Sequence, residues 1–389
     1  MIKIINLIGA RPQIIKAAAI SRAIRTNYPD LIKDIVIHTG QHYDENMSGQ
    51  FFTQLEIPHP SYNLSCGSAS HAKQTAMIME RIETVFVKEV PDFLLVYGDT
   101  NSTLAASLVA VKMGIEVIHV EAGLRSYNKS MPEEINRIVC DHVSTILFCP
   151  TVQAIENLKK EGFNCQSENI SPDCPQIIHS GDIMYDNAIY YSKRALKESS
   201  ILTQLNLEGK NFVLFTLHRD LNTDNPKRLN SIFEAITEYL SEEDNRIVFP
   251  IHPRTQKMIK KLLPNGLYQK IRTLKNLIIT EPLSFYDFIN LEANCKLILT
   301  DSGGVQKEAF FFKKPCIVLR PETEWVELVE SGNAIIADAN KTLITKSLNS
   351  FSNNNKLNYP SFYGNGNAAV DICQIIVERY YKKKELEKN

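Results

Sequence analysis

The stretch KLILTDSGGVQKEA, from Lys296 to Ala309, joins a short apolar run to a glycine turn and the start of a helical pattern. The apolar run has the length and composition of a buried strand. A turn made of Ser302, Gly303 and Gly304 frees several backbone N–H groups and aims them, with the helix dipole, at one point. That point favours an anion such as phosphate, although a Gly-Gly turn also occurs where a helix and a strand simply pack closely.

The same succession of apolar run and helical pattern recurs along the chain. Continuous runs rich in Val, Ile and Leu, separated by amphipathic segments, indicate parallel strands in a sheet covered on both faces, the doubly wound α/β class. The runs form two sets of six: IKIINLIG, DIVIHTG, FLLVYGD, EVIHVEAG, TILFCPT and IIHSGDI, then NFVLFTLHR, RIVFPIHP, LIITEPL, KLILTDSGG, PCIVLR and AIIAD.

The gap between the two sets predicts where the chain divides. The first set ends near Asp182, a helix-like segment follows, and the second set begins near Asn211. The polar, Pro-containing segment 164–176 suits a loop at the hinge. A length of 389 residues, 44% of them hydrophobic, also favours two domains, because single cores stop growing at a smaller size. Near the C-terminus, Gly364 and Gly366 are interpreted as a turn into the last helix.

Composition argues against several kinds of partner and location. Lys plus Arg total 43 against 44 Asp plus Glu, so the whole chain has no field that favours nucleic acid or an anionic membrane. The N-terminal apolar run is too short for a secretory signal, and no segment approaches the roughly 20 apolar residues of a membrane span. The eight cysteines form no CxxC pair, and several lie in apolar runs where a reduced thiol acts as a small hydrophobic group. We therefore expect a cytoplasmic protein.

Polar side chains gather directly after the predicted strands, where ligands bind in open α/β sheets. For any single cluster a helix cap is the simpler explanation. Clusters at successive strand ends are harder to explain as caps, so together they favour a ligand site. They contain Arg11 and Lys16 in GARPQIIK, Asp99 in GDTNST, Glu121 and Arg125 in EAGLRS, His218 and Arg219 in HRDLNTD, and His252 and Arg254 in HPRT.

Two common nucleotide-binding fingerprints are missing. Neither G-x-G-x-x-G nor G-x-x-x-x-G-K-[ST] occurs in the sequence. A dinucleotide redox site and a P-loop NTPase therefore both lose support.

Eight motifs, in this order and spread over nearly the whole chain, resemble those of the bacterial UDP-N-acetylglucosamine 2-epimerases: GARPQIIK, HTGQH, VYGDTNST, HVEAGLRS, MPEEINR, TLHR, IHPRT and DSGGVQKEA. The resemblance implies a glycosyltransferase-B-like fold of two Rossmann-type domains with an interdomain cleft, without metal or nicotinamide cofactor. It implies an N-terminal domain over residues 1–182 that carries the catalytic carboxylates, joined by a returning C-terminal helix over residues 366–389. Residues 183–365 would form the UDP-binding domain, and the enzyme would be a homodimer.

The resemblance also implies which residues bind the nucleotide. The turn donates to the diphosphate through its backbone, and Arg11 and His252 add side-chain donors. Glu308, in the first turns of the following helix, accepts from ribose hydroxyls. Phe288 lies against uracil, although without the resemblance a core aromatic on an amphipathic helix would be preferred. The implied UDP site is Arg11, His252, Phe288, Ser302, Gly303, Gly304 and Glu308.

A second implied set is catalytic. The C2 hydrogen of a sugar nucleotide is not next to a carbonyl, so its removal is feasible only as the C1–O bond breaks and UDP leaves. Inversion then requires acid/base groups on both faces of the ring. The carboxylates Asp99, Glu121 and Glu133 are the candidates, and which faces which side stays open. The implied cations for the departing diphosphate are Lys16, Arg137 and His218. Without the motif, Glu133 and Arg137 would be a weak surface pair at i, i+4.

Several departures from the commonest family pattern bear on the substrate. The chain has Ala10 and Gln13 where G-T-R-P-E is usual, Tyr97 and Asn101 where H-G-D-T-T-T is usual, and Trp325 where T-E-R-P-E has a cation. These variants resemble the subgroup that acts on UDP-2,3-diacetamido-2,3-dideoxyglucuronate, an O-antigen precursor. UDP-N-acetylglucosamine itself remains a candidate substrate.

The pair Gln41 and His42 raises the question of regulation. In the family this pair lies beside a second sugar-nucleotide site, where the next residue is commonly Arg, but here it is Tyr43. The loss of one phosphate partner weakens the regulatory interpretation, so a position on the rim of the active cleft is the alternative.

Three functions remain to be separated. The first is a non-hydrolysing 2-epimerase, and the second is a hydrolysing relative that releases UDP and a free N-acetylmannosamine-type sugar. The third is a glycosyltransferase or nucleotide-sugar binding module of the same fold. A transferase needs no trio of carboxylates at the strand ends of the first domain, so Asp99, Glu121 and Glu133 argue against the third.

Overall fold

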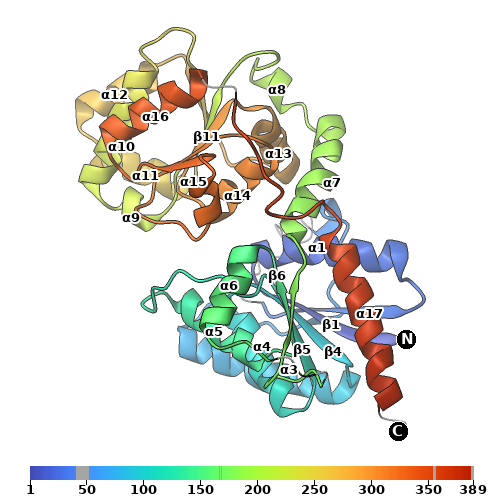
Figure 1. Ribbon diagram of the computed structural model, residues 1–389. Coiled ribbons are helices and arrows are strands. Elements are labelled where there is room, and N and C mark those ends of the chain that lie inside the picture. The colour runs from blue at the N-terminus through green and yellow to red at the C-terminus, as the bar shows by residue number, and fades with distance from the viewer. Residues whose placement is uncertain (41–51, 166, 168, 354–355, 387–389) are drawn as a thin grey trace. The chain divides into compact units, whose positions relative to one another are not determined.

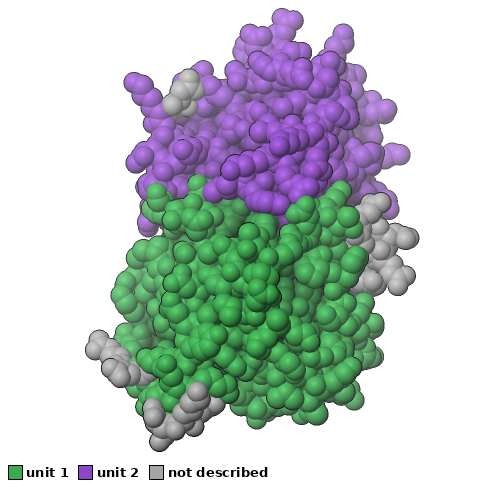
Figure 2. Space-filling view, turned by 90° about the vertical axis from the view of Figure 1, so that its right-hand side faces the viewer, with its two compact units in different colours: residues 1–187, 361–389 green, residues 188–360 purple. Residues whose placement is uncertain are grey.

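The computed structural model divides the chain into two compact units, and it describes residues 1–40, 52–165, 167, 169–353 and 356–386. Unit 1 comprises residues 1–187 and 361–389, and unit 2 comprises residues 188–360; Figure 2 colours them green and purple. Within the described ranges, no helix is both long and apolar enough to cross a membrane.

Unit 1 is built on a parallel sheet that contains, among its described residues, seven strands in the order β3-β2-β1-β4-β5-β6-β7. Figure 1 labels β1, β4, β5 and β6 of this sheet. The strands are β1 (Ile2–Ile8), β2 (Ile32–His38), β3 (Tyr62–Asn63), β4 (Phe93–Tyr97), β5 (Glu116–Val120), β6 (Ile146–Cys149) and β7 (Gln176–His179). All six predicted runs of the first set form strands, and the two-residue β3, too short to leave an apolar run, was not predicted. The central strands are buried on both faces, which explains their continuous apolar sequence.

The helices of unit 1 follow the strands as the doubly wound class requires. They are α1 (Arg11–Asn27), α3 (His71–Glu89), α4 (Asn101–Lys112), α5 (Pro132–Val143), α6 (Val152–Lys160) and α17 (Ala368–Leu386). The last helix, α17, contacts α1, and Arg379 on it donates to both oxygens of Glu116 at 3.0 and 2.9 Å. The C-terminal helix α17 therefore belongs to unit 1, although the whole of unit 2 separates it in sequence from the rest of that unit.

Unit 2 has, within the described ranges, a six-stranded parallel sheet in the order β10-β9-β8-β11-β12-β13. Its strands are β8 (Val213–Thr216), β9 (Ile247–Pro250), β10 (Leu277–Thr280), β11 (Leu297–Thr300), β12 (Cys316–Val318) and β13 (Ala334–Ile336), the second predicted set. Its helices are α8 (Ile201–Gln204), α9 (Asp220–Thr223), α10 (Pro226–Tyr239), α11 (Pro253–Leu262), α12 (Asn265–Thr273), α13 (Phe285–Asn294), α14 (Gly303–Phe311), α15 (Val326–Glu330) and α16 (Lys341–Asn353). Phe215, Phe233 and Phe249 pack together between the sheet and α10.

The chain passes between the units within α7 (Ile183–Glu198) and again before Ser361. On the unit 1 side, Asp186 of α7 accepts from the backbone N–H groups of Ala368 and Ala369 at 3.2 and 2.8 Å. This carboxylate therefore caps the first turn of α17. Burial raises the pKa of Asp186 to about 6, against the opposing effect of these two hydrogen bonds.

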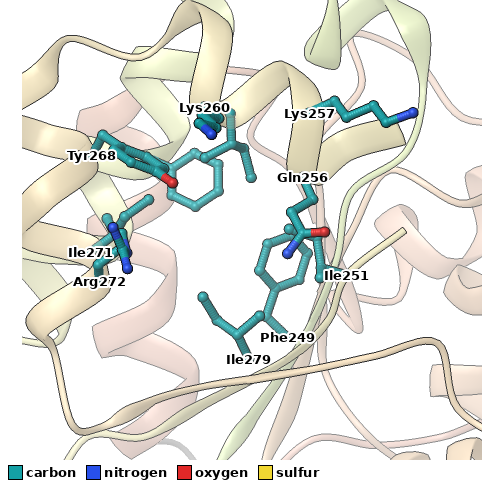
Figure 3. A pocket seen from close by; sticks show the side chains of 11 residues that line it. Phe249, Ile251, Gln256, Lys257, Lys260, Tyr268, Ile271, Arg272 and Ile279 are labelled. Atoms are coloured by element: carbon teal, nitrogen blue, oxygen red, sulfur yellow. The ribbon is translucent and has the colours of Figure 1, made fainter. Parts of the chain in front are cut away.

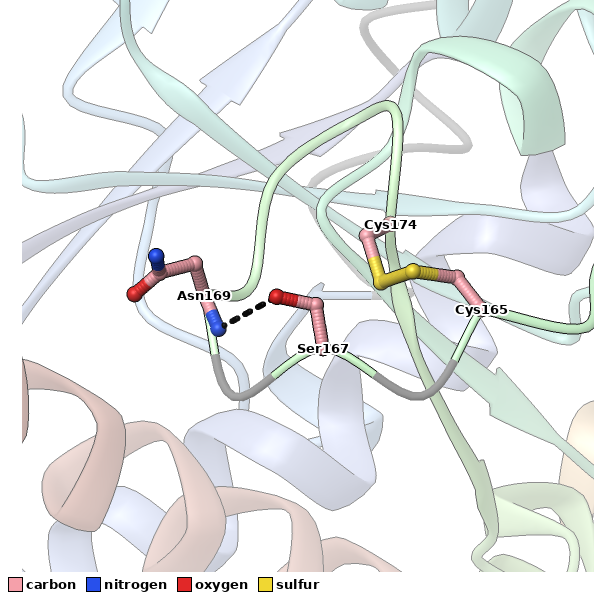
Figure 4. The surroundings of a disulfide bond; sticks show 4 residues. All are labelled: Cys165, Ser167, Asn169 and Cys174. Atoms are coloured by element: carbon pink, nitrogen blue, oxygen red, sulfur yellow. Dashed lines mark hydrogen bonds between the residues drawn. A yellow bond between two sulfur atoms is a disulfide. The ribbon is translucent and has the colours of Figure 1, made fainter.

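The described residues of segment 164–176 form a loop up to the start of β7, as predicted, but this loop connects α6 to β7 inside unit 1 and does not lie at the hinge. A disulfide joins Cys165 to Cys174 across it, with their Cα atoms 5.3 Å apart, and Ser167 accepts from the backbone N–H of Asn169 (Figure 4). The treatment of the cysteines as reduced thiols is therefore wrong for these two. The others are buried and unpaired with one another: Cys66, Cys140, Cys149, Cys295, Cys316 and Cys373.

Candidate active site

Strand order places the predicted residues at the point where ligands bind in sheets of this class. In unit 1 the order reverses between β1 and β4, and in unit 2 between β8 and β11. Crevices form beyond the carboxyl ends of the strands at such switch points. Arg11 and Asp99 follow β1 and β4, and His218 and Ser302 follow β8 and β11. In each unit, predicted residues therefore follow the two strands that flank the switch point.

In unit 1 the structure joins Lys16 to Glu121. Lys16 Nζ lies 2.6 Å from Glu121 Oε1, and both side chains are about nine-tenths buried. Gly98, with φ of +61°, lies directly beside this pair. A Cβ at this position would lie 3.2 Å from the Lys16 ammonium. Glu121 itself has φ of +72°, a backbone conformation that costs a residue with a side chain roughly 1–2 kcal/mol.

Asp99 and Arg137 form the second pair. Arg137 Nη2 contacts Asp99 Oδ2, and Arg137 Nη1 lies 3.2 Å from Glu134. About a third of the Asp99 side chain is exposed, and the rest is covered by protein. Burial raises the pKa of Asp99, and the Arg137 guanidinium and the Lys16 ammonium oppose this rise. The two carboxylates therefore have different environments although they follow neighbouring strands.

The two adjacent glutamates of MPEEINR have opposite positions. Glu134 is buried and accepts from the backbone N–H groups of Ser126 and Tyr127, both at 2.9 Å, so it fixes the preceding loop. Glu133 is exposed in the first turn of α5. Glu134 thus has a structural role, and Glu133 is the glutamate of this pair that solvent or substrate can reach. The structure pairs Arg137 with Asp99 and Glu134, which distinguishes it from a surface side chain.

In unit 2, Asp301 organises the switch point. The last residues of β8 and β11 are register partners, and Asp301 accepts from the backbone N–H groups of His218 and Arg219 at 3.1 and 3.0 Å. His218 is about half exposed, and its Nδ1 lies 3.4 Å from Asp301. Burial lowers the pKa of His218, the Asp301 carboxylate opposes this effect, and the neighbouring Arg219 and His252 lower the pKa further.

The glycine turn begins α14 as predicted, with Ser302 as its N-cap. The Ser302 hydroxyl accepts from the backbone N–H of Val305 at 3.5 Å. A Cβ on Gly303 would lie 2.3 Å from Glu324 Oε1, so a larger residue there would displace that side chain, whereas a Cβ on Gly304 would meet open space. Gly304 therefore leaves the helix N-terminus accessible, which is what an anion site requires.

His252 is the N-cap of α11. Its Nδ1 accepts from the backbone N–H of Arg254 at 3.2 Å. A neutral imidazole that accepts at Nδ1 carries its proton on Nε2, so the exposed edge of the ring is a donor. This geometry suits the predicted contact of His252 with a phosphate oxygen. Arg254 does not share that role in the structure, because it is ion-paired with Asp220 and Asp224.

Phe288 and Glu308 are both half-buried. Glu308 lies next to Glu292, whose side chain is buried on α13. Burial and the Glu308 charge raise the pKa of Glu292 well above its ordinary value. Sequence reasoning missed Glu292 because an acidic residue on an amphipathic helix is normally solvent-exposed.

The hydrogen bonds of Gln13 also escaped sequence reasoning. The buried Gln13 accepts from the N–H groups of Gly9 and Ala10 and donates to the carbonyl of Tyr97, all within 3.1 Å. It therefore joins the turn after β1 to the end of β4, a task that needs the amide's combination of acceptor and donor.

Trp325 was predicted to replace a cation near the sugar nucleotide. The structure shows that its indole N–H donates to the carbonyl of Gly303 at 3.0 Å. The buried indole therefore stabilises the glycine turn. The Lys307 ammonium lies 4.3 Å from the centre of the indole ring. A cation is thus still present here, supplied by α14 and stacked on the indole.

The remaining predicted residues fall outside these clusters. Arg11 is exposed at the start of α1. Gln41 and His42 lie outside the described residues, so their regulatory role stays a prediction. In unit 2 a cavity of about 450 Å³ lies beside α11, α12, β9 and β10 (Figure 3). Its lining includes none of the predicted site residues.

Comparison with known proteins agrees with this geometry. The sequence profile of the family described as UDP-N-acetylglucosamine 2-epimerase matches residues 26–377. A UDP-N-acetylglucosamine 2-epimerase homolog of Methanococcus maripaludis is 45% identical, with 96% of this chain and 99% of that protein covered. A UDP-2,3-diacetamido-2,3-dideoxy-D-glucuronate 2-epimerase of Pseudomonas aeruginosa is 43% identical, with 97% and 99% covered.

Solved structures give the same result. The crystal structure of Methanocaldococcus jannaschii UDP-GlcNAc 2-epimerase, in complex with UDP-GlcNAc and UDP, superposes with a TM-score of 0.82 at 42% identity. The match covers 97% of this chain and 100% of that chain. The fold is thus the α/β, glycosyltransferase-B-like one that the sequence predicted, and this chain belongs to the UDP-N-acetylglucosamine 2-epimerase family.

Proposed function

We propose that this protein inverts C2 of a UDP-2-acetamido sugar and returns the product with UDP attached. Family membership makes it an epimerase, and the similar M. jannaschii enzyme was crystallised with UDP-GlcNAc and UDP. The residue roles below rest on the geometry of each unit and on the motifs.

The observation that carries the proposal is the pair of ion-paired carboxylates at adjacent strand ends of unit 1. Lys16 holds Glu121, and Arg137 holds Asp99. Breaking the C1–O bond gives C1 oxocarbenium character, so the C2 proton becomes removable and a 2-acetamidoglucal forms with UDP. Re-addition of UDP with proton delivery to the other face inverts C2, which requires two carboxyl groups in different environments.

The roles follow from these environments. Asp99, whose pKa burial raises, and Glu121 are proton carriers, and the exposed Glu133 is a third candidate. Lys16, Arg137 and His218 supply positive charge or donors for the departing diphosphate. UDP itself is bound by Arg11, His252, Phe288, Ser302, Gly303, Gly304 and Glu308. The exposed Gly304 and the donor edge of His252 support this part of the proposal.

Two substrates are proposed, UDP-N-acetylglucosamine and UDP-2,3-diacetamido-2,3-dideoxyglucuronate. The P. aeruginosa relative at 43% identity is named for the second. The Trp325–Lys307 pair beside the glycine turn favours the second as well, because it departs from the commonest family pattern. A homodimer, a cytoplasmic location and a place in surface-polysaccharide precursor synthesis complete the proposal. The Cys165–Cys174 disulfide stands against the location, since disulfides are rare in the cytosol.

The experiment is incubation of the enzyme with each UDP-sugar in D2O, followed by NMR. The proposed mechanism gives a mixture of gluco- and manno-type UDP-sugars with deuterium at C2, since the delivering acid exchanges with water. Free glucal and UDP should appear only as slow leakage, because the intermediate is retained. Stoichiometric UDP with a free reducing sugar would replace the proposal by the hydrolysing alternative. Consumption of UDP-sugar only with an added acceptor would indicate a transferase.

A further inference from the structure

His119, a residue of HVEAGLRS to which the catalytic scheme gives no role, is fully buried near the end of β5. Its Nδ1 lies 2.7 Å from Asp141 Oδ1 on α5, and its Nε2 lies 2.8 Å from the carbonyl oxygen of Gly98. Both nitrogens therefore face oxygen atoms that only accept hydrogen bonds. A neutral imidazole has a single N–H, so this geometry requires the doubly protonated, positively charged ring.

The surroundings are organised to hold this charge. Asp141 Oδ2 accepts from Arg125 Nη1 at 2.7 Å, and Arg125 donates from Nε and Nη2 to the two oxygens of Glu161, also at 2.7 Å. Two cations thus alternate with two carboxylates, and the group is neutral as a whole. Burial alone would lower the pKa of His119, but Cys140 and Asp141 of α5 raise it well above its ordinary value.

The bond to Gly98 connects His119 to the catalytic carboxylates. The N–H of Gly98 donates to the Val120 carbonyl at 3.0 Å, so His119 and its strand neighbour hold both polar groups of this one glycine. Asp99 is the next residue. Gly98 also lies directly beside the Lys16–Glu121 pair. A displacement of the Gly98 carbonyl would therefore move Asp99 and loosen the Lys16–Glu121 pair together.

We propose that His119 is a positioning residue that stays positively charged and fixes, through its Nε2–H bond to Gly98, the backbone from which Asp99 projects. This inference rests on the proposed function, because it concerns how the carboxylates of that reaction are held. A neutral ring would place a lone pair against either the Gly98 carbonyl or the Asp141 carboxylate, and the unpaired buried acceptor would destabilise the turn. His119 does not touch the sugar and transfers no proton to it.

Two amide substitutions test the two hydrogen bonds of the His119 ring one at a time. In His119→Gln the amide nitrogen lies near the position of Nε2 and can still donate to Gly98. In His119→Asn it lies near the position of Nδ1 and can donate only to Asp141. We expect His119→Asn to lower kcat about tenfold or more with little change in KM, and His119→Gln to stay within a few-fold of wild type. A wild-type kcat for His119→Asn, or equal losses in both variants, would overturn the proposal.

Folding and charge are checked independently. His142→Asn changes an exposed histidine of α5 to an amide and should leave kcat unchanged. UDP should raise the Tm of both His119 variants as it does for wild type, because the glycine turn is in unit 2. In the wild-type protein, ¹⁵N NMR of the imidazole should show both nitrogens still protonated at about pH 7.5, above the ordinary His pKa of about 6.5. A neutral His119 at that pH would overturn the proposal even if both variants fail to fold. A wild-type protein without epimerisation would instead count against the proposed function, and the NMR result would still decide the charge of His119.

Discussion

The two switch points of this chain prepare for a ligand in different ways. In unit 1, charged side chains are paired with one another: Lys16 with Glu121, and Arg137 with Asp99. In unit 2, the polar groups belong largely to the backbone and to helix caps, at Ser302 and His252, and stay accessible. The same sheet topology thus supports a rigid ionic cluster in one unit and an open set of donors in the other.

The difference suggests a division of labour. Ion-paired carboxylates keep a fixed geometry, and burial raises the pKa of Asp99, which suits general acid/base catalysis. Donors at a helix N-terminus stay unsatisfied until an anion binds, which suits a diphosphate. We therefore expect substitutions in unit 1 to affect turnover and substitutions in unit 2 to affect UDP binding.

The largest effect is expected in unit 1. Asp99→Asn and Glu121→Gln should each lower kcat about 10³-fold, because an amide cannot exchange the proton, and Glu133→Gln should behave alike if that residue is a third carrier. UDP should still raise the Tm of each variant. Glu156→Gln, which removes an exposed carboxylate paired with Lys159, is the control and should keep wild-type turnover. Normal turnover in any one variant would remove that residue from the catalytic set.

The next effect tests unit 2. Ser302→Asp should abolish the Tm increase caused by UDP, because the new carboxylate would lie where the diphosphate is expected and repel it. Asn225→Asp is a matched control, since it also places a carboxylate at an exposed helix N-cap of unit 2. The control should keep the UDP-induced shift. An undiminished shift in Ser302→Asp would contradict the assignment of the glycine turn to phosphate.

A third prediction concerns stability in unit 1. The pKa of Asp186 is raised from 3.8 to about 6, so the folded state binds this proton more tightly than the unfolded state does. The associated stability is present below about pH 3.8 and is lost as the pH rises through about 6. Relative to Asp186→Asn, wild type should therefore lose up to about 3 kcal/mol of unfolding free energy between pH 4 and pH 7. Thermal or denaturant unfolding of both proteins across this range measures the difference, and a pH-independent difference would contradict it.

The smallest effect concerns how rigidly unit 2 presents its turn. Trp325→Phe keeps a ring beside Lys307 but removes the donor to the Gly303 carbonyl. The lost hydrogen bond is worth about 1 kcal/mol, so UDP affinity measured by calorimetry should fall about fivefold. Unchanged affinity would mean that the turn holds its shape without the indole.

The sequence predicted the parts of this protein that depend on local pattern. Buried parallel strands require continuous apolar runs, and all twelve predicted runs form strands. The turn at Ser302 and the polar residues after each strand were also predicted, because strand ends and helix N-termini have recognisable local chemistry. The motifs pointed to the family, which the comparisons confirm.

Only the tertiary structure decided which polar side chains pair, because the partners come from separate strands and helices. Glu134 and Glu133 are neighbours in sequence, yet one fixes a loop and the other is exposed. The Cys165–Cys174 disulfide also became visible only in the structure, since a spacing of nine residues does not specify a bond. His119 shows the reason most clearly: its charge follows from Asp141 and Gly98, which are 22 and 21 residues away and reach the ring only when the sheet forms. Local pattern specifies an element and its end, whereas the identity of a buried partner depends on how elements distant in the chain pack together.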